Sequence, residues 1–134
     1  MNKNVYIEKL TFSINNCFAP EESFHYKFKN NQGELKYSFG FKILDNKIVE
    51  FDEYVKISQH ILTLVKNWKR QYDPKIKILD GILWELKIKL SNGNWICSNG
   101  HHTFPPNYNK FYDYLNSFVG IRGLIQEYKQ KYGF

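Results

Sequence analysis

Two adjacent histidines, His101 and His102, are the first residues whose type could support chemistry. An imidazole can act as a general base near neutral pH or ligate a metal ion. Metal sites in proteins generally need three or four ligands, and adjacent side chains on an extended chain point apart. Cys97 precedes the pair by four residues, while His25 and His60 are distant in the sequence. A small metal-dependent hydrolase built on the histidine pair is therefore our third-ranked hypothesis.

Carboxylates and glycine-rich motifs provide no stronger catalytic signal. Asp80 falls in a turn, where its side chain bonds the backbone, and Glu85 falls on the polar face of a strand. The chain contains no phosphate-binding GxxxxGK[ST] or GxGxxG motif and no GxSxG nucleophile motif. We therefore expect no catalytic residue, no cofactor and no metal ligand.

Aromatic residues and lysines near the end of the chain indicate binding rather than catalysis. Nucleic-acid bases stack on aromatic rings beside cationic side chains, and faces rich in Tyr and Trp also bind proteins. Packing in the core is the preferred interpretation for most of the rings, which include Phe104, Tyr108, Tyr112 and Tyr114. The residues expected to contact a partner are Lys87, Lys89, Trp95, His101, His102, Thr103 and Lys110.

The positive charge of the chain comes almost entirely from lysine. The net charge is +6, and Arg70 and Arg122 are the two arginines. Sites that read phosphates or bases rely on the planar fork of arginine, and the lysines here are spread along the whole chain. The first hypothesis is therefore a non-enzymatic protein-binding module of the inhibitor or immunity type, from a bacterium or a phage, that occludes a partner surface.

A basic inhibitor suits a partner with an acidic face, or a nucleic-acid-handling protein whose ligand it blocks. The second-ranked hypothesis is a nucleic-acid-binding domain that uses a face of the sheet bearing lysines and aromatic residues, with binding that weakens steeply as salt rises. The sequence makes no prediction of oligomeric state.

Alternating hydrophobic residues predict strands in the first third of the chain. Residues 4–16 form one strand, with a change of phase near Glu8-Lys9 that indicates a bulge. A hairpin follows, with strands over 24–28 and 35–43 around a turn at 30–33. His25 falls on the polar face of this hairpin and is expected to be exposed.

A change of period predicts a helix over 52–72, with Asp52 as its N-cap and Asp73-Pro74 at its end. A short strand at 76–78 and a hairpin with its turn at 91–94 follow. A helix begins near Asn107, and a further helix carries the apolar residues of 121–128. The predicted fold is α+β, a single domain over 1–134. Its antiparallel sheet has five or six strands in the order βββα-βββ-αα, with the helices on one face.

The stretch 80–111 has a recurring pattern. It contains Asp80-Gly81, Trp84-x-Leu86-x-Ile88, Ser98-x-Gly100 and Phe104-Pro105-x-Asn107 ahead of a helix. This pattern resembles a stretch of small uncharacterised bacterial and phage proteins that reads approximately DGxxWxLxI, a turn and SGSNAYPxNF. The resemblance implies a shared hairpin, loop and helix, and no activity. His101-His102-Thr103 replace small polar residues of that pattern, so a loop that binds something would bind it differently in this chain.

The cellular location is predicted from what the sequence lacks. No apolar run reaches the length of about 18 residues that a membrane helix needs, and the first residues do not resemble a signal peptide. The two cysteines are far apart and form no CxxC motif, which predicts buried or half-buried free thiols in a reducing compartment. We therefore expect a cytoplasmic protein with no membrane partner.

Overall fold

The computed structural model describes residues 5–16, 20–74 and 81–119. The strands and helices in these ranges lie in the order ββββαβββα. Their bounds are β1 Ile7–Asn16, β2 Glu22–Lys29, β3 Gln32–Phe39, β4 Lys42–Glu50, α1 Phe51–Val65, β5 Gln71–Tyr72, β6 Ile82–Leu90, β7 Trp95–His101 and α2 Tyr108–Phe118.

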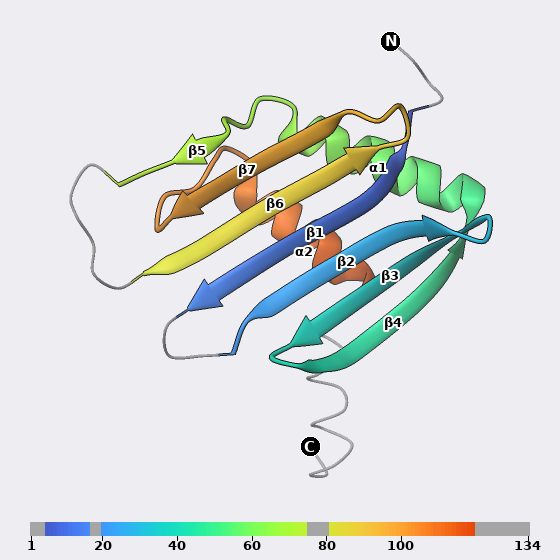
Figure 1. The fold of residues 1–134 in the computed structure, drawn as a ribbon, viewed down its shortest axis with the longest axis horizontal. Coiled ribbons are helices and arrows are strands. Elements are labelled where there is room, and N and C mark those ends of the chain that lie inside the picture. Colours follow the sequence, from blue (N-terminus) through green and yellow to red (C-terminus); the bar gives the residue numbers. More distant parts are fainter. Residues whose placement is uncertain (1–4, 17–19, 75–80, 120–134) are drawn as a thin grey trace.

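The strands form one sheet in the order β4-β3-β2-β1-β6-β7-β5. Neighbouring strands are antiparallel except β5, which pairs with β7 in parallel, so the seven-stranded sheet is mixed. Both helices lie behind the sheet in Figure 1, and no described element covers the face in front. The predicted α+β fold with helices on one face is confirmed, but the sheet has seven strands rather than five or six and is mixed rather than purely antiparallel.

Alternation along the strands determines which face the helices cover. On β6, the side chains of Trp84, Leu86 and Ile88 are buried, whereas Glu85 and Lys87 are exposed. Successive side chains of a strand point to opposite faces, so the buried set faces the helices and the charged set faces outward. The outward side of the sheet, called the open face below, is therefore largely polar, with the exposed hydrophobic side chains of Ile43, Ile48, Leu83 and Trp95 among the polar ones.

Each helix packs one apolar stripe against the sheet. On α1 the stripe includes Tyr54, Ile57 and Ile61, which recur at helical spacing and are almost fully buried. On α2 it includes Phe111 and Leu115. The core is thus a single layer of apolar and aromatic side chains between the sheet and the two helices.

The predicted strand over 35–43 is wrong because it contains a turn. Strand β3 ends at Phe39, and Gly40 and Phe41 connect it to β4. Gly40 has a φ of +65°, a conformation that glycine adopts easily. Phe39, Phe41 and Ile43 continue the period of two across this turn, so alternation did not reveal it.

The first helix is shorter than predicted, since α1 ends at Val65 and its N-cap is Glu50 rather than Asp52. The spacing of apolar residues reaches Trp68, but this residue follows the helix. Its indole N–H donates a hydrogen bond to the carbonyl of Pro106, with an N–O distance of 2.7 Å. Trp68 is therefore half-buried against the α2 side of the core and not by continuation of the helix.

Other predicted features have mixed outcomes. The bulge between Ile7 and Lys9, the turn over 91–94 and the helix from Tyr108 are all present. Cys97 is exposed, so its predicted burial is wrong. The predicted strand at 76–78, the helix at 121–128 and Cys17 lie outside the described residues. None of the helices that the structure describes is long and apolar enough to cross a membrane.

Two buried tyrosines should respond oppositely to loss of the hydroxyl. Tyr26 donates a hydrogen bond to the carbonyl of Leu115 at 2.7 Å, whereas the Tyr54 hydroxyl has no partner among the described residues. Tyr54→Phe should raise the free energy of unfolding by about 1 kcal/mol, because it removes a buried polar group without a partner. Tyr26→Phe should lower it by about 1 kcal/mol. Urea denaturation measures both, and equal losses would contradict the prediction.

Candidate functional site

The open face carries a cluster of lysines at one end. The strand register places Lys9 directly between Lys27 on β2 and Lys89 on β6. In the adjacent row, Thr11 lies between His25 and Lys87, and Lys36 lies opposite His25 on β3. We call the following set the lysine patch: Lys9, Lys27, Lys36, Lys87 and Lys89.

Carboxylates lie beside most of the lysine patch: three of its five lysines form ion pairs, and Glu34 lies directly opposite Lys27 on β3. The ammonium of Lys36 lies 2.7 Å from Glu34, and this hydrogen bond is the main reason why the pKa of Glu34 is lowered. Lys87 and Lys89 make longer pairs of 3.7 and 3.8 Å with Glu85 and Glu8. Lys9 and Lys27 form no ion pair with any described residue. The centre of the patch therefore keeps unpaired positive charge.

This arrangement opposes folding. Like charges directly opposite each other on neighbouring strands destabilise a sheet, and the row Lys27–Lys9–Lys89 contains two such pairs. Exposure alone does not require a lysine to lie directly opposite another lysine. Stability therefore does not explain this row of like charges at the centre of a sheet face that no described element covers.

His25 reports the electrostatic potential of the patch. Its pKa is lowered from the ordinary value of 6.5, first by burial and then by the charges of Lys9 and Lys36, while Glu21 acts in the opposite direction. The residue is exposed, as predicted, but its ring is partly desolvated, and this burial together with the surrounding lysines disfavours its protonation. His25 therefore remains neutral at pH 7 and leaves the lysines as the cations of the site.

Removal of one lysine should raise the pKa of His25. Lys9→Met eliminates a nearby positive charge, so the pKa should move part of the way back towards 6.5, since burial remains. Titration of the imidazole C–H signals by NMR measures this shift. In the wild-type chain, the free energy of unfolding should decrease as the pH falls below 6.5, because the folded state resists protonation of His25. Lys56→Met, on α1, should leave the pKa of His25 unchanged.

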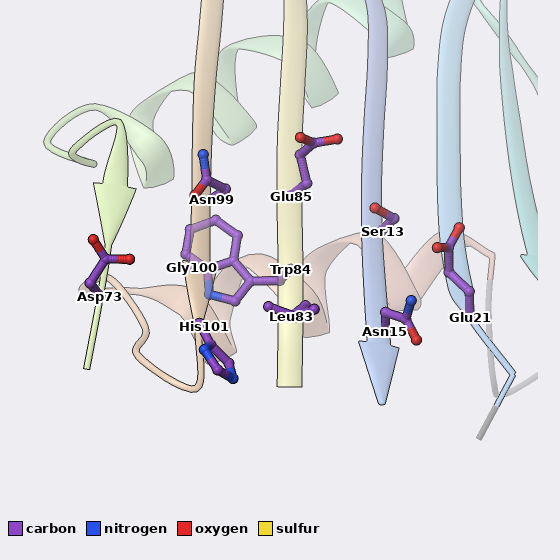
Figure 2. A pocket seen from close by; sticks show the side chains of 10 residues that line it. All are labelled: Ser13, Asn15, Glu21, Asp73, Leu83, Trp84, Glu85, Asn99, Gly100 and His101. Atoms are coloured by element: carbon purple, nitrogen blue, oxygen red, sulfur yellow. The ribbon is translucent and has the colours of Figure 1, made fainter. Parts of the chain in front are cut away.

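The other end of the open face is a shallow depression of about 410 Å³ with acidic and neutral polar side chains. Figure 2 shows Glu85 on β6, Asn99 on β7 and Ser13 on β1, with His101 below them at the end of β7. Among the described residues, no three side chains of the His, Cys, Asp and Glu types form a group that could hold a metal ion. The depression therefore offers hydrogen-bonding groups but, among the described residues, no metal-binding group.

The structure brings together only part of the predicted contact surface. Lys87, Lys89 and Trp95 are neighbours on the open face, where Trp95 lies opposite Lys89 with 56% of its surface exposed. His101 is on the same face but at the acidic end. Lys110 belongs to α2, on the covered side of the sheet.

The loop after β7 has a structural role at two of its predicted contact residues. The carbonyl of Thr103 accepts a hydrogen bond from the indole N–H of Trp84 at 2.9 Å. The Nδ1 atom of His102 accepts a weak hydrogen bond of 3.4 Å from the backbone N–H of Ile82. His102 has a φ of +49° and remains exposed, so its ring is accessible to a partner, as is that of Phe104.

Sequence reasoning missed the lysines at the centre of the patch. Lys9, Lys27 and Lys36 alternate with apolar residues on their strands, so their exposure was predictable. Their juxtaposition depends on the register between β1, β2 and β3, which has no local signal. The proposed stacking rings Tyr108 and Tyr112 belong to α2, on the covered side of the sheet, and do not line the lysine patch.

Comparison with known proteins assigns no family to the chain. No protein-family model, no curated protein and no solved structure matches it. The geometry and charge of the open face are therefore the basis for assigning a function.

Proposed function

We propose that this protein is a non-enzymatic binding module of the inhibitor or immunity type that covers an acidic surface of a partner protein with its open sheet face. The observation that carries the proposal is the row Lys27–Lys9–Lys89, in which Lys9 faces a lysine on each side and forms no described ion pair, where no described element covers the sheet. Complementary charges steer two proteins together and exclude partners with the wrong charge. Trp95 at the margin of the row adds an exposed aromatic residue of the kind that contributes strongly to interfaces.

A protein partner fits this face better than a nucleic acid. Single-stranded nucleic acids are held by aromatic rings that stack on successive bases beside basic residues. Among the described strands, Trp95 is the one aromatic side chain exposed on the open face. The tyrosines and phenylalanines of these strands face the helices. The patch also contains no arginine, which is the usual residue for bidentate contacts to phosphates and bases. A protein surface with many carboxylates requires neither stacking rings nor arginine. The separate, flexible ammonium groups of lysines can pair with its carboxylates directly.

Site-specific photo-crosslinking tests this proposal. Thr11 lies between His25 and Lys87 at the centre of the open face, so a benzoyl-phenylalanine placed there would lie within reach of a bound partner. The same group at Lys56, an exposed residue of α1, is the matched control. We expect crosslinked protein from the Thr11 position in a lysate of the native host, and none from the Lys56 position.

Two further measurements test whether the crosslink depends on charge complementarity. The adduct should disappear when Lys9 and Lys27 are both replaced by glutamate, and the crosslinked peptide should be rich in Asp and Glu by mass spectrometry. Adducts that are destroyed by nuclease would instead support the nucleic-acid hypothesis. Equal crosslinking from Thr11 and Lys56 would overturn the proposal, because it would show contact without preference for the open face.

A further inference from the structure

A second cavity lies on the covered side of the sheet, where α2 passes the ends of β1 and β6. Its volume is about 610 Å³, within the range of small-molecule sites. Apolar and aromatic side chains form much of its wall, among them Ile14, Ile82, Phe104, Tyr108 and Tyr112. Glu22 also lines it, so an acidic group and several aromatic rings share one pocket.

The carboxylate of Glu22 is held in position by two tyrosine hydroxyls, and both hydrogen bonds are to the same oxygen. Its Oε2 atom accepts hydrogen bonds from the hydroxyls of Tyr37 and Tyr112, both with O–O distances of 2.9 Å. Burial, followed by the charge of Glu22, raises the pKa of both tyrosines, so they remain protonated donors. Oε1 has no hydrogen-bond partner among the described residues. A carboxylate oriented in this way can accept a hydrogen bond from a ligand.

Aromatic rings next to this carboxylate favour a cationic ligand. The rings of Phe104 and Tyr108 lie against each other, with centroids 4.6 Å apart, and Phe104 remains 38% exposed. The face of an aromatic ring attracts an ammonium group within about 6 Å of its centroid. An apolar stem on the same ligand would gain from burial against Ile14 and Ile82.

We propose that this pocket binds a small organic ammonium ion on an apolar stem, such as a primary alkylamine or arylalkylamine. The ammonium donates a hydrogen bond to Oε1 of Glu22, and the stem lies against Phe104 and Tyr108. Lys110 also lines the pocket and is exposed, so it opposes the ligand's charge from the solvent side. The site is on the opposite side of the sheet from the lysine patch and does not depend on the function proposed for that patch.

Calorimetric titration with benzylamine and with benzyl alcohol, its neutral analogue, tests the charge requirement in the wild-type chain. We expect benzylamine to bind at least about tenfold more tightly, because only the charged ligand interacts strongly with the carboxylate. Equal affinities, or no binding of benzylamine, would overturn the proposal. A lysine-containing tripeptide is a third probe. If it binds more tightly than benzylamine, the ammonium is supplied by a peptide, and the same chemistry of recognition is supported.

Variants then assign the ammonium to Glu22. Glu22→Gln should weaken benzylamine binding about tenfold and leave benzyl alcohol unaffected. Glu21→Gln is the matched control, since Glu21 is the adjacent residue, carries the same charge and lines the depression on the open face. Lys110→Gln should strengthen benzylamine binding, because it removes a repelling charge while the hydrogen bonds of Glu22 remain. Unchanged affinity in Glu22→Gln, or weaker binding in Lys110→Gln, would contradict the assigned geometry.

Discussion

Replacement of Trp84 by alanine should lower the free energy of unfolding by about 4 kcal/mol, the range typical of buried large aromatic residues. Trp84 has only 2% of its surface exposed and lies at the centre of a group of rings. Its centroid is 5.6 Å from both Trp68 and Tyr108, and 5.9 Å from Tyr72. Truncation would leave a cavity between β6, β5 and α2. The surrounding rings could fill it only by giving up their contacts with one another.

The indole also fixes the loop after β7. Its N–H donates to the carbonyl of Thr103 at 2.9 Å, and a Cβ atom at Gly100 would overlap the indole ring. Gly100 is therefore needed for the close approach of Trp84 to the backbone of β7. Trp84→Phe should show an intermediate loss, because it keeps an aromatic ring and removes the hydrogen bond. Gly100→Ala should also destabilise, by about 2 kcal/mol, through overpacking of the same contact.

Urea denaturation measures the free energies of unfolding of these variants. Far-UV circular dichroism is the signal to follow, because it does not depend on tryptophan fluorescence. Leu83→Ala is the matched control, because Leu83 is adjacent on β6 and faces outward with 52% of its surface exposed. This variant should change the free energy of unfolding by no more than about 0.5 kcal/mol. A loss of similar size in Leu83→Ala and Trp84→Ala would show that β6 does not bury the face described here.

Much of the fold was predictable because each strand has one apolar and one polar face. The alternation of Trp84, Leu86 and Ile88 predicts both the strand and its buried side, and it holds in the structure. The turn at Gly40-Phe41 could not be found in this way, since the residues on either side keep the same phase. The end of α1 was similarly hidden, because the spacing of Trp68 continues the helical stripe although the chain has left the helix.

The candidate site was predictable only in its chemistry. The sequence indicates a lysine-bearing sheet face, and Lys87 and Lys89 belong to it. It does not show that β1 lies between β2 and β6, which is the fact that places Lys9 beside Lys27 and Lys89. Pairing between strands distant in the chain is decided by the packing of the whole core, so a functional cluster that spans several strands has no local sequence signal.

Lys9→Glu should affect stability and binding in opposite directions. Lys9 lies directly opposite Lys27 on one side and Lys89 on the other, so glutamate converts two repulsive cross-strand pairs into attractive ones. Since each such pair contributes up to about 1 kcal/mol, the free energy of unfolding should rise by about 1 kcal/mol. The gain should diminish in high salt, which screens exposed charges.

The same substitution should weaken binding to an acidic partner. We expect the Kd for fluorescently labelled polyglutamate, measured by anisotropy at low salt, to rise about tenfold, because a negative charge now lies at the centre of the contact. Lys56→Glu changes the net charge equally and is the control. It lies on α1 one turn after Asp52, so it should destabilise the helix slightly and leave binding almost unchanged.

The two measurements together separate a binding site from a coincidence of lysine-rich composition. Lysines placed without function would be expected to avoid direct like-charge pairs, because each pair reduces stability and a single substitution relieves it. If Lys9→Glu makes the chain more stable and weakens its binding, contact with an anionic partner explains why lysine is present at this position. If Lys9→Glu and Lys56→Glu weaken polyglutamate binding equally, net charge alone explains the interaction. The open face would then not be the binding surface.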